Sequence, residues 1–367
     1  MTNDIEKAKS PPVLFRAHIA AVAAKHGFSR SLLGGLLLLA AMQSHAAPKV
    51  VVSVLPVHSL VSAVMGDVGE PQLLIPGGQS PHTGRLKPSQ VGALEAADLI
   101  VWIGPLLEQP VEKIIARRRA TARVVTLLEN PALTVQPGRQ GDEWQWPDEE
   151  EAHTNHADGT HDTHDTHDTH DTHDTHDTHD THDSHAHDTH DHWQVDPHVW
   201  LSFDNARAIV DIVARELADL DPSNGARYGA NARELSAKLA QLRQSLHADL
   251  RGVADAPYMV FHDAYGYFER EFGLQSVAAL TISVERPPGA KRIRQIREFI
   301  HARKVRCIFS EPQFQPDLVD TLAADTNIGT GVLDPLGAEL AAGPEAWFDL
   351  MRGLADALLV CLGRPLK

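Results

Sequence analysis

The chain has 367 residues, which exceeds the roughly 100–200 residues of one typical domain and predicts two lobes with appended segments. Its formal net charge is −16, but residues 140–196 contain eighteen Asp and Glu and no Lys or Arg, so the rest of the chain is nearly neutral. Because nucleic acids are bound by clustered Lys and Arg, this charge distribution argues against a nucleic-acid partner.

Residues 1–46 have the pattern of a secretory signal peptide. A charged stretch ends at Arg30, an apolar run extends from Leu32 to Ala41, and small residues follow at Ser44-His45-Ala46. The apolar run is about half as long as the roughly 20 residues that cross a bilayer, so it predicts a cleaved signal rather than a permanent anchor. No cysteine follows this segment directly, so we expect a soluble periplasmic protein rather than a lipid-anchored one.

Residues 47–221 alternate short β-branched runs with amphipathic stretches. Strands that alternate with helical patterns pair in parallel, and parallel sheets are covered by helices on both faces. These residues therefore predict an N-terminal α/β lobe. The alternating runs are Val50–Leu55, Leu60–Met65, Gln72–Ile75, Ser89–Ala96 and Leu99–Ile103.

Within this lobe, residues 142–192 form an unusual insertion. Eight consecutive Thr-His-Asp triplets run from Thr160 to Asp183, and almost no aliphatic residue accompanies them, so the segment cannot bury enough apolar surface to become ordered. Its fourteen histidines alternate with carboxylates, and such donors suit zinc and similar metals. We predict a disordered insertion that binds several ions weakly. A repeat expansion without a selected function is the alternative.

Residues 222–253 predict one long helix between two lobes. The segment opens with Pro222-Ser223-Asn224, has no Pro or Gly between Gly229 and Gly252, and places leucines at three- and four-residue spacings. We expect a rigid connector, with an ordinary surface helix as the alternative. Residues 254–367 then resume the alternation of strands and helices and predict a second α/β lobe. Its elements are expected at Tyr258–Phe261, Ile293–His301, Val305–Phe309, Leu318–Ala323 and Gly331–Leu333.

Three histidines outside the insertion stand in distinctive contexts. His82 lies in a loop beyond a predicted strand, His198 follows Asp196-Pro197, and His262 directly follows a strand of the second lobe. Open α/β sheets bind ligands in the crevice at the carboxyl ends of their strands, so these side chains are candidates to converge on one ion between the lobes. His58 also follows a strand, and we favour a role other than metal ligand for it.

Longer motifs around these residues carry a family resemblance. They are Leu86-Lys87-Pro88-Ser89, Asp196-Pro197-His198-Val199-Trp200-Leu201, Phe261-His262-Asp263-Ala264-Tyr265-Gly266, Glu311-Pro312-Gln313-Phe314 and Leu333-Asp334-Pro335-Leu336-Gly337. With them the chain resembles the periplasmic zinc-binding proteins of the high-affinity zinc ABC transporter, the ZnuA family, over residues 49–364. The resemblance implies that His82, His198 and His262 are metal ligands. Manganese- and iron-binding relatives usually place a carboxylate at the third position, so the third imidazole favours zinc.

The fourth ligand is less clearly marked in the sequence. Some family members have a glutamate immediately before the first histidine, but this chain has Pro81 there, which offers no donor side chain. Asp334, at the end of a predicted strand, matches a carboxylate used in the wider group of metal-binding relatives, and water is its rival. A turn-forming role before Pro335 is the alternative for Asp334, and a structural role is favoured for Glu311.

The chain has two cysteines, Cys307 and Cys361. An even pair in an exported protein is a disulfide candidate, and two buried thiols are the alternative. The family resemblance also implies a C-terminal disulfide at these positions.

The resemblance implies that the protein captures Zn²⁺ in the periplasm as a transported substrate and delivers it to an inner-membrane ABC permease. We expect a monomer without catalytic activity, with the insertion as a weak zinc collector or sensor. A zinc hydrolase is one rival, because three histidines with an open fourth position also occur in catalytic sites, but the chain has no His-Glu-x-x-His motif. A periplasmic zinc buffer or chaperone without a transporter is another.

Overall fold

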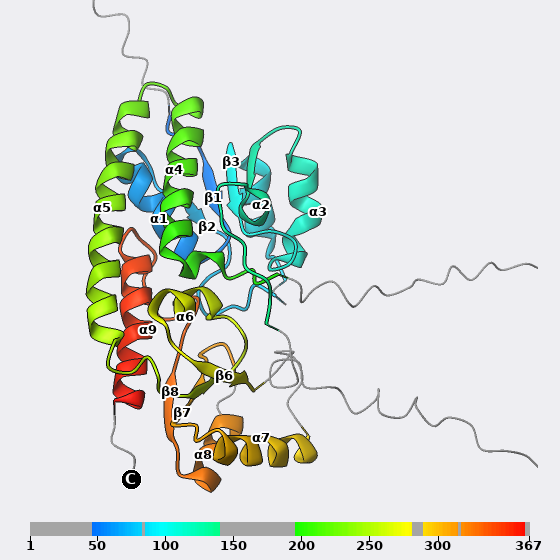
Figure 1. Ribbon diagram of the computed structural model, residues 1–367. Coiled ribbons are helices and arrows are strands. Elements are labelled where there is room, and N and C mark those ends of the chain that lie inside the picture. Colours follow the sequence, from blue (N-terminus) through cyan, green and yellow to red (C-terminus); the bar gives the residue numbers. More distant parts are fainter. Residues whose placement is uncertain (1–45, 83–84, 140–194, 281–288, 315–316, 364–367) are drawn as a thin grey trace, which may run out of the picture. The chain divides into compact units, whose positions relative to one another are not determined.

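The alternation of apolar strands and amphipathic helices forms two α/β lobes, which confirms the predicted fold class. Each lobe contains a four-stranded parallel sheet with accompanying helices (Figure 1). The signal segment up to residue 45 and the insertion 142–192 lie outside the described residues, so both stay predictions. The computed structural model describes residues 46–82, 85–139, 195–280, 289–314 and 317–363.

The N-terminal sheet has the strand order β2-β1-β3-β4, and all neighbouring strands are parallel. Every residue of β1 and β3 is buried, which explains why both strands are unbroken apolar runs. The strands are β1 (Val50–Val52), β2 (Gln72–Leu73), β3 (Leu99–Trp102) and β4 (Arg123–Thr126). The helices are α1 (Leu55–Met65), α2 (Pro88–Ala96) and α3 (Gln109–Arg118), with short 3₁₀ turns at Gly66–Val68 and Leu127–Glu129.

The C-terminal sheet repeats this topology with the order β6-β5-β7-β8. In both sheets the first strand lies inside the sheet, and the chain crosses from one side of it to the other. Such a switch point places a ligand-binding crevice at the carboxyl ends of the strands. The strands are β5 (Tyr258–Val260), β6 (Ser276–Ala279), β7 (Cys307–Ser310) and β8 (Gly329–Val332). The helices are α6 (Gly266–Phe272), α7 (Ala290–Ala302) and α8 (Asp317–Thr326).

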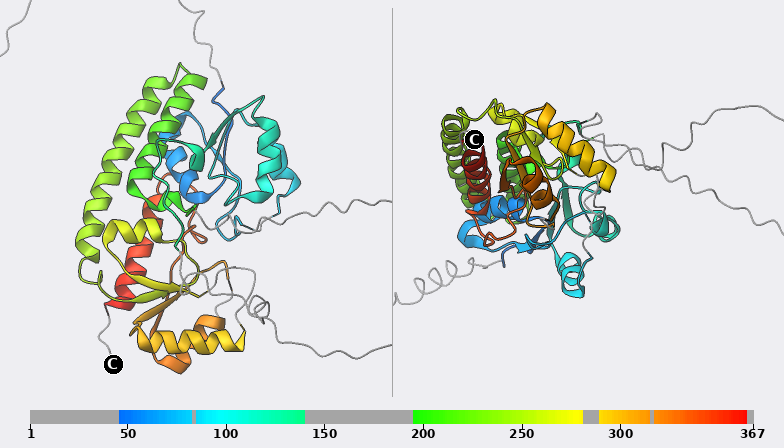
Figure 2. Two further views of the ribbon diagram at one scale, coloured as in Figure 1. Left: turned by 45° about the vertical axis from the view of Figure 1, so that its right-hand side comes forward. Right: turned by 90° about the horizontal axis from the view of Figure 1, so that it is seen from below.

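Two long helices, α4 (Phe203–Leu220) and α5 (Gly225–Leu250), lie side by side and connect the sheets (Figures 1 and 2). The 26 residues of α5 fall within the predicted helix 222–253. Asp221 forms the turn before α5, because its carboxylate accepts hydrogen bonds from the Asn224 side chain at 2.7 Å and the Tyr228 hydroxyl at 2.9 Å. The leucines of α5 are buried, so the helix is part of the core.

The last helix, α9 (Ala346–Leu362), packs against α1 and α5, so the two lobes share one apolar core. Trp347 fixes this packing: its backbone N–H donates to the Ser59 hydroxyl at 2.9 Å, and its indole N–H donates to the Trp200 carbonyl at 2.9 Å. The indole of Trp200 in turn donates to the Pro335 carbonyl at 2.8 Å. A 3₁₀ turn at Val199–Leu201 carries Trp200. The C-terminal segment is therefore anchored in both lobes.

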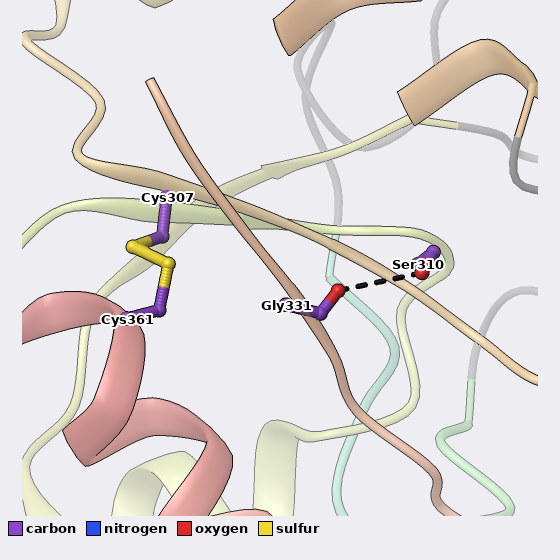
Figure 3. The surroundings of a disulfide bond; sticks show 4 residues. All are labelled: Cys307, Ser310, Gly331 and Cys361. Carbon is purple, nitrogen blue, oxygen red and sulfur yellow. Dashed lines mark hydrogen bonds between the residues drawn. A yellow bond between two sulfur atoms is a disulfide. The ribbon is translucent and has the colours of Figure 1, made fainter. Parts of the chain in front are cut away.

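The structure contains the disulfide between Cys307 of β7 and Cys361 of α9 (Figure 3). The bond passes close to Gly329 of β8, where an added Cβ atom would lie 2.8 Å from the Cys361 sulfur and 3.1 Å from the Cys307 sulfur. Only a glycine leaves room for this crossing. The disulfide therefore ties the last helix to the C-terminal sheet across a strand that has no side chain in the way.

Candidate metal centre

The structure brings His82, His198 and His262 together. Each offers one ring nitrogen, and these nitrogens all lie within 4.8 Å of one another. Nε2 of His262 lies 3.4 Å from Nε2 of His198. Two ligands on a tetrahedral zinc ion with Zn–N bonds of about 2.0–2.1 Å are separated by roughly 3.3 Å. The two imidazoles thus already have the spacing of a zinc-ligand pair.

Different parts of the chain deliver the three side chains. His82 lies in the loop after β2, His198 directly precedes the 3₁₀ turn at Val199–Leu201, and His262 follows β5 at the carboxyl edge of the C-terminal sheet. The crevice expected from the strand topology is therefore where the histidines meet. His82 and His198 come from the N-terminal lobe, and His262 comes from the C-terminal lobe.

Asp196 orients His198. One carboxylate oxygen of Asp196 accepts a hydrogen bond from the His198 backbone N–H at 2.9 Å and lies 2.8 Å from Nδ1 of the same residue. Burial raises the pKa of Asp196 to about 7, although the hydrogen bond from His198 and the charge of Arg139 oppose this rise. Donation from Nδ1 leaves Nε2 with its lone pair free, which is the form of imidazole that binds a metal.

Glu311 has the same relationship to His262. Its Oε1 atom lies 2.7 Å from Nδ1 of His262 and also accepts from the His262 backbone N–H at 3.3 Å. Glu311 is 2% exposed and follows β7, the strand beside β5. A buried carboxylate thus fixes the ring and points Nε2 toward the other two histidines.

The surroundings keep two of the three imidazoles neutral. Burial, followed by the charges of His198 and His262, lowers the pKa of His82 to about 3. Burial and the charge of His262 also hold the pKa of His198 well below its usual value. Burial lowers the pKa of His262 as well, but the charge and hydrogen bond of Glu311, together with the charges of Asp263 and Asp196, outweigh it, so the pKa of His262 is raised. Neutral imidazoles are the form that metals bind.

Asp334, the expected fourth ligand, does not join the group of three histidines in the described part of the chain. Its Oδ1 atom accepts from the backbone N–H groups of Leu336 at 3.0 Å and Gly337 at 2.9 Å and from the Gln313 side chain at 3.0 Å. The backbone N–H of Ala338 donates to the other oxygen. Asp334 therefore forms the turn that follows β8, which is the alternative role considered for it.

A small cavity of about 10 Å³ adjoins the three histidines. This volume corresponds to roughly one water-sized probe. Pro81 lies on its wall at the position where a preceding glutamate would have supplied a carboxylate, and Trp200 contacts the His198 ring with ring centroids 5.2 Å apart. The site therefore has space for a small species beside the three imidazoles.

His58 lies elsewhere, as expected. It belongs to α1, and its Nε2 atom lies 2.9 Å from the Pro71 carbonyl oxygen. The residue lines a separate cavity of about 680 Å³ between α1, α5 and the segment before α9. His58 therefore has a local hydrogen bond and does not face the three-histidine group.

Sequence reasoning missed the partners of the imidazoles. Asp196 was visible two residues before His198, and Glu311 was visible after a strand that neighbours the His262 strand. A carboxylate within reach of a candidate ligand was the available signal for both. Arg139 lies close enough for its charge to affect both Asp196 and His198, and no sequence pattern marked it.

Solved structures share this fold. A crystal structure of ZnuA matches with a TM-score of 0.64 and 23% sequence identity, covering 86% of this chain and 99% of the other. A crystal structure of the laminin-binding protein Lbp of Streptococcus pyogenes matches with a TM-score of 0.60 and 20% identity, covering 87% of this chain and 100% of the other. At these identities the likeness establishes the fold alone.

Sequence comparison identifies the family. The family profile "ZnuA: Zinc-uptake complex component A periplasmic" matches residues 50–361. The high-affinity zinc uptake system protein ZnuA of Brucella suis biovar 1 (strain 1330) is 45% identical over 315 residues, which are 86% of this chain and 92% of the relative. Its namesake from Yersinia pestis is 31% identical over 335 residues, which are 91% and 97% of the two chains. The chain therefore belongs to the ZnuA family, as its motifs indicated.

Proposed function

We propose that the protein captures Zn²⁺ at His82, His198 and His262 and passes it to an inner-membrane ABC permease. The observation that carries this proposal is the convergence of three imidazole nitrogens within 4.8 Å, drawn from both lobes. Imidazole is a preferred zinc ligand. The family description and the names of the relatives, which are zinc uptake components, support the same metal and the same task.

The fourth zinc ligand in this proposal is a water molecule. Among the described residues, no fourth His, Cys, Asp or Glu joins the three histidines. Asp334 is the less favoured candidate, because backbone N–H groups and Gln313 already donate to its oxygens. A three-histidine site that keeps one exchangeable position suits a protein that must release its ion.

Transport is favoured over catalysis at this site. A zinc hydrolase needs a general base beside the metal-bound water. The nearby carboxylates Asp196 and Glu311 instead hold the Nδ1 atoms of His198 and His262. The family is described as a component of an uptake complex, which is a binding role and not an enzymatic one.

The family description, a periplasmic component of a zinc-uptake complex, supports a periplasmic location. In the described residues no helix has the length and apolar character to cross a membrane. The proposal also includes a cleaved signal peptide at 1–46, a monomeric state and a membrane permease as partner. The apolar run before Ser44 supports the first of these.

The proposed organisation keeps the boundaries drawn from the sequence. An N-terminal lobe comprises residues 47–221, a linker helix 222–253, and a C-terminal lobe 254–367. The insertion 142–192 acts as a weak zinc collector or sensor, which its alternating His and Asp side chains support. It would supplement the three-histidine site rather than replace it.

Zinc uptake by cells tests the proposed function. The full chain is expected to restore growth in zinc-poor medium to a strain that lacks its own periplasmic zinc-uptake component. The variant with His82→Ala, His198→Ala and His262→Ala is expected to fail, and a His301→Ala variant on the exposed end of α7 is the control. A chain that binds zinc tightly but never restores uptake would support a zinc buffer or chaperone instead.

A further inference from the structure

One arginine joins the N-terminal and C-terminal lobes beside the metal centre. The Nε atom of Arg139 donates to Oδ1 of Asp263 at 2.8 Å, and its Nη2 atom bonds the same oxygen. Its Nη1 atom donates to Oε2 of Glu269 at 2.5 Å and to the Ser276 hydroxyl at 2.9 Å. A single side chain of the N-terminal lobe thus contacts three residues of the C-terminal lobe.

These partners belong to the structure that carries His262. Asp263 follows His262 directly. Glu269 belongs to α6, its side chain is 5% exposed, and its second oxygen accepts from the hydroxyl of Tyr258 in β5 at 2.7 Å. Arg139 is therefore linked to the strand before His262, to the residue after it and to the helix that follows.

The backbone beside Arg139 is tied to the segment that carries His198. The N–H of Asp196 donates to the Gln136 carbonyl at 2.9 Å. The Tyr267 hydroxyl accepts from the Gln136 N–H at 2.9 Å and donates to the Asp196 carbonyl at 3.0 Å. Asp196 in turn holds the His198 ring, so the segment 136–139 connects the two ligand-bearing segments.

We propose that Arg139 is a positioning residue that holds His198 and His262 at the spacing of two zinc ligands and thereby slows zinc dissociation. This inference rests on the proposed function of the three-histidine site. Asp263 and Glu269 pair with the guanidinium and offset part of its charge. Its planar fork of donors fixes the distance and angle between the partners, which a single ammonium group does not do.

A positioning role and a purely electrostatic role for Arg139 predict opposite changes in the zinc dissociation rate when the arginine is removed. If Arg139 acted mainly through its charge, its loss would leave two carboxylates uncompensated near the ion, and zinc would dissociate more slowly. If Arg139 holds the lobes in register, its loss lets the two imidazoles separate, and zinc dissociates faster. The direction of the change in dissociation rate therefore separates the two roles.

The test uses the full chain loaded with Zn²⁺ and a chromophoric chelator that captures the released ion in stopped flow. The slowest phase is expected to report the tight site, because the insertion 142–192 is proposed to bind its ions weakly. Arg139→Gln is expected to accelerate the slowest phase about tenfold, the lower end of the range for residues that support metal ligands. Arg139→Lys, which keeps the charge but loses the fork, is expected to accelerate it as well. The association rate is expected to change less than about twofold, because the positioning opposes release of the ion.

Arg123→Gln is the matched control, because Arg123 forms ion pairs with Glu216 and Asp219 within the N-terminal lobe, away from the histidines. It should leave the slowest phase unchanged. The inference is overturned if the slowest phase of zinc release is unchanged or slower in both Arg139 variants. This holds even if the melting temperature of the zinc-free chain falls. Arg139→Lys remains measurable if Arg139→Gln does not fold.

The same measurement on His262→Ala separates this inference from the proposed function. Loss of the slow phase in His262→Ala, together with wild-type rates in the Arg139 variants, contradicts only the role of Arg139. Retention of the slow phase in His262→Ala contradicts the three-histidine site itself.

Discussion

Nδ1 of His262 lies 2.7 Å from Oε1 of Glu311, so a carboxylate at the end of β7 holds an imidazole at the end of the neighbouring strand β5. Asp196 holds His198 in the same way at 2.8 Å. A ligand histidine that donates from one nitrogen to a carboxylate presents the other nitrogen to the metal in a fixed direction and with increased basicity. Two such pairs and His82 make up the candidate centre.

Glu311→Gln should weaken zinc binding without removing a ligand. The amide keeps the shape of the side chain and an acceptor for Nδ1 of His262 but loses the negative charge. Residues that support metal ligands typically change affinity about 10–100-fold when mutated, and about tenfold is expected here because one hydrogen bond survives. Competition with a chelator of known affinity, on the chain without residues 142–192, measures the change. Glu129→Gln, on an exposed 3₁₀ turn, should have no effect, and equal affinity of both variants would contradict the role of Glu311.

Zinc binding should release one proton per ion, so the zinc affinity should fall as the pH falls. The pKa of His262 is raised despite its burial, chiefly by the charge of Glu311, so zinc must displace a proton from this ring as the pH falls through that pKa. His82, with a pKa of about 3, and His198, with a pKa well below normal, are already neutral there. The affinity should therefore drop about tenfold per pH unit below the pKa of His262.

Calorimetry of the chain without residues 142–192, in two buffers with different ionisation enthalpies, counts these protons without those released by the histidines of the insertion. Release of one proton is the expected value near pH 6, and Glu311→Gln should shift the onset of release to lower pH because it removes the main cause of the raised pKa. Release of two or three protons would show that His82 and His198 titrate in the same range.

Asp334→Asn should affect folding more than zinc binding. Three backbone N–H groups and Gln313 donate to the Asp334 carboxylate, and an amide replaces one acceptor with a donor. The free energy of unfolding should fall by about 1.5–3 kcal/mol, the range for hydrogen bonds to charged groups. Zinc affinity should change less than about threefold. A loss of tenfold or more in affinity, with unchanged stability, would make Asp334 the fourth ligand after all.

Asp334 shows which features of the site could be predicted from the sequence and which could not. Parallel strands end at one edge of a sheet, so His262 could be placed at the crevice from its position after β5 alone. Glu311 and Asp334 follow the neighbouring strands β7 and β8 in the same manner. Only the path of the loop decides which carboxylate faces the histidines, and the turn at Pro335 directs Asp334 to backbone N–H groups instead.

Contacts between segments that lie far apart in the sequence could not be predicted either. The alternation of strands and helices predicted both sheets, and the leucine spacing predicted α5. No local pattern indicated that Trp347 of α9 would bond to Ser59 of α1, 288 residues earlier in the chain. Arg139 was also invisible, because its partners Asp263 and Glu269 come from another lobe.

Gly329→Ala should destabilise the chain, because its new methyl group would lie 2.8 Å from the Cys361 sulfur. Overpacking of this kind typically costs about 1–3 kcal/mol. Gly353→Ala in α9 is the matched control, since an added Cβ atom meets nothing within 4 Å there, and alanine should stabilise the helix by about 0.5–1 kcal/mol. Denaturant unfolding of both variants measures the difference. Equal stability would argue against the close crossing of β8 and the disulfide.

The most direct test of the account is zinc calorimetry on the chain without residues 142–192 and on its His82→Ala, His198→Ala and His262→Ala variants. Removal of the insertion eliminates its weak sites, so one tight zinc equivalent should remain in the parent. Each alanine variant should lose tight zinc binding, because only two of the three imidazole ligands remain. Equal zinc affinity in all four proteins, or no tight equivalent in the parent, would contradict the three-histidine site.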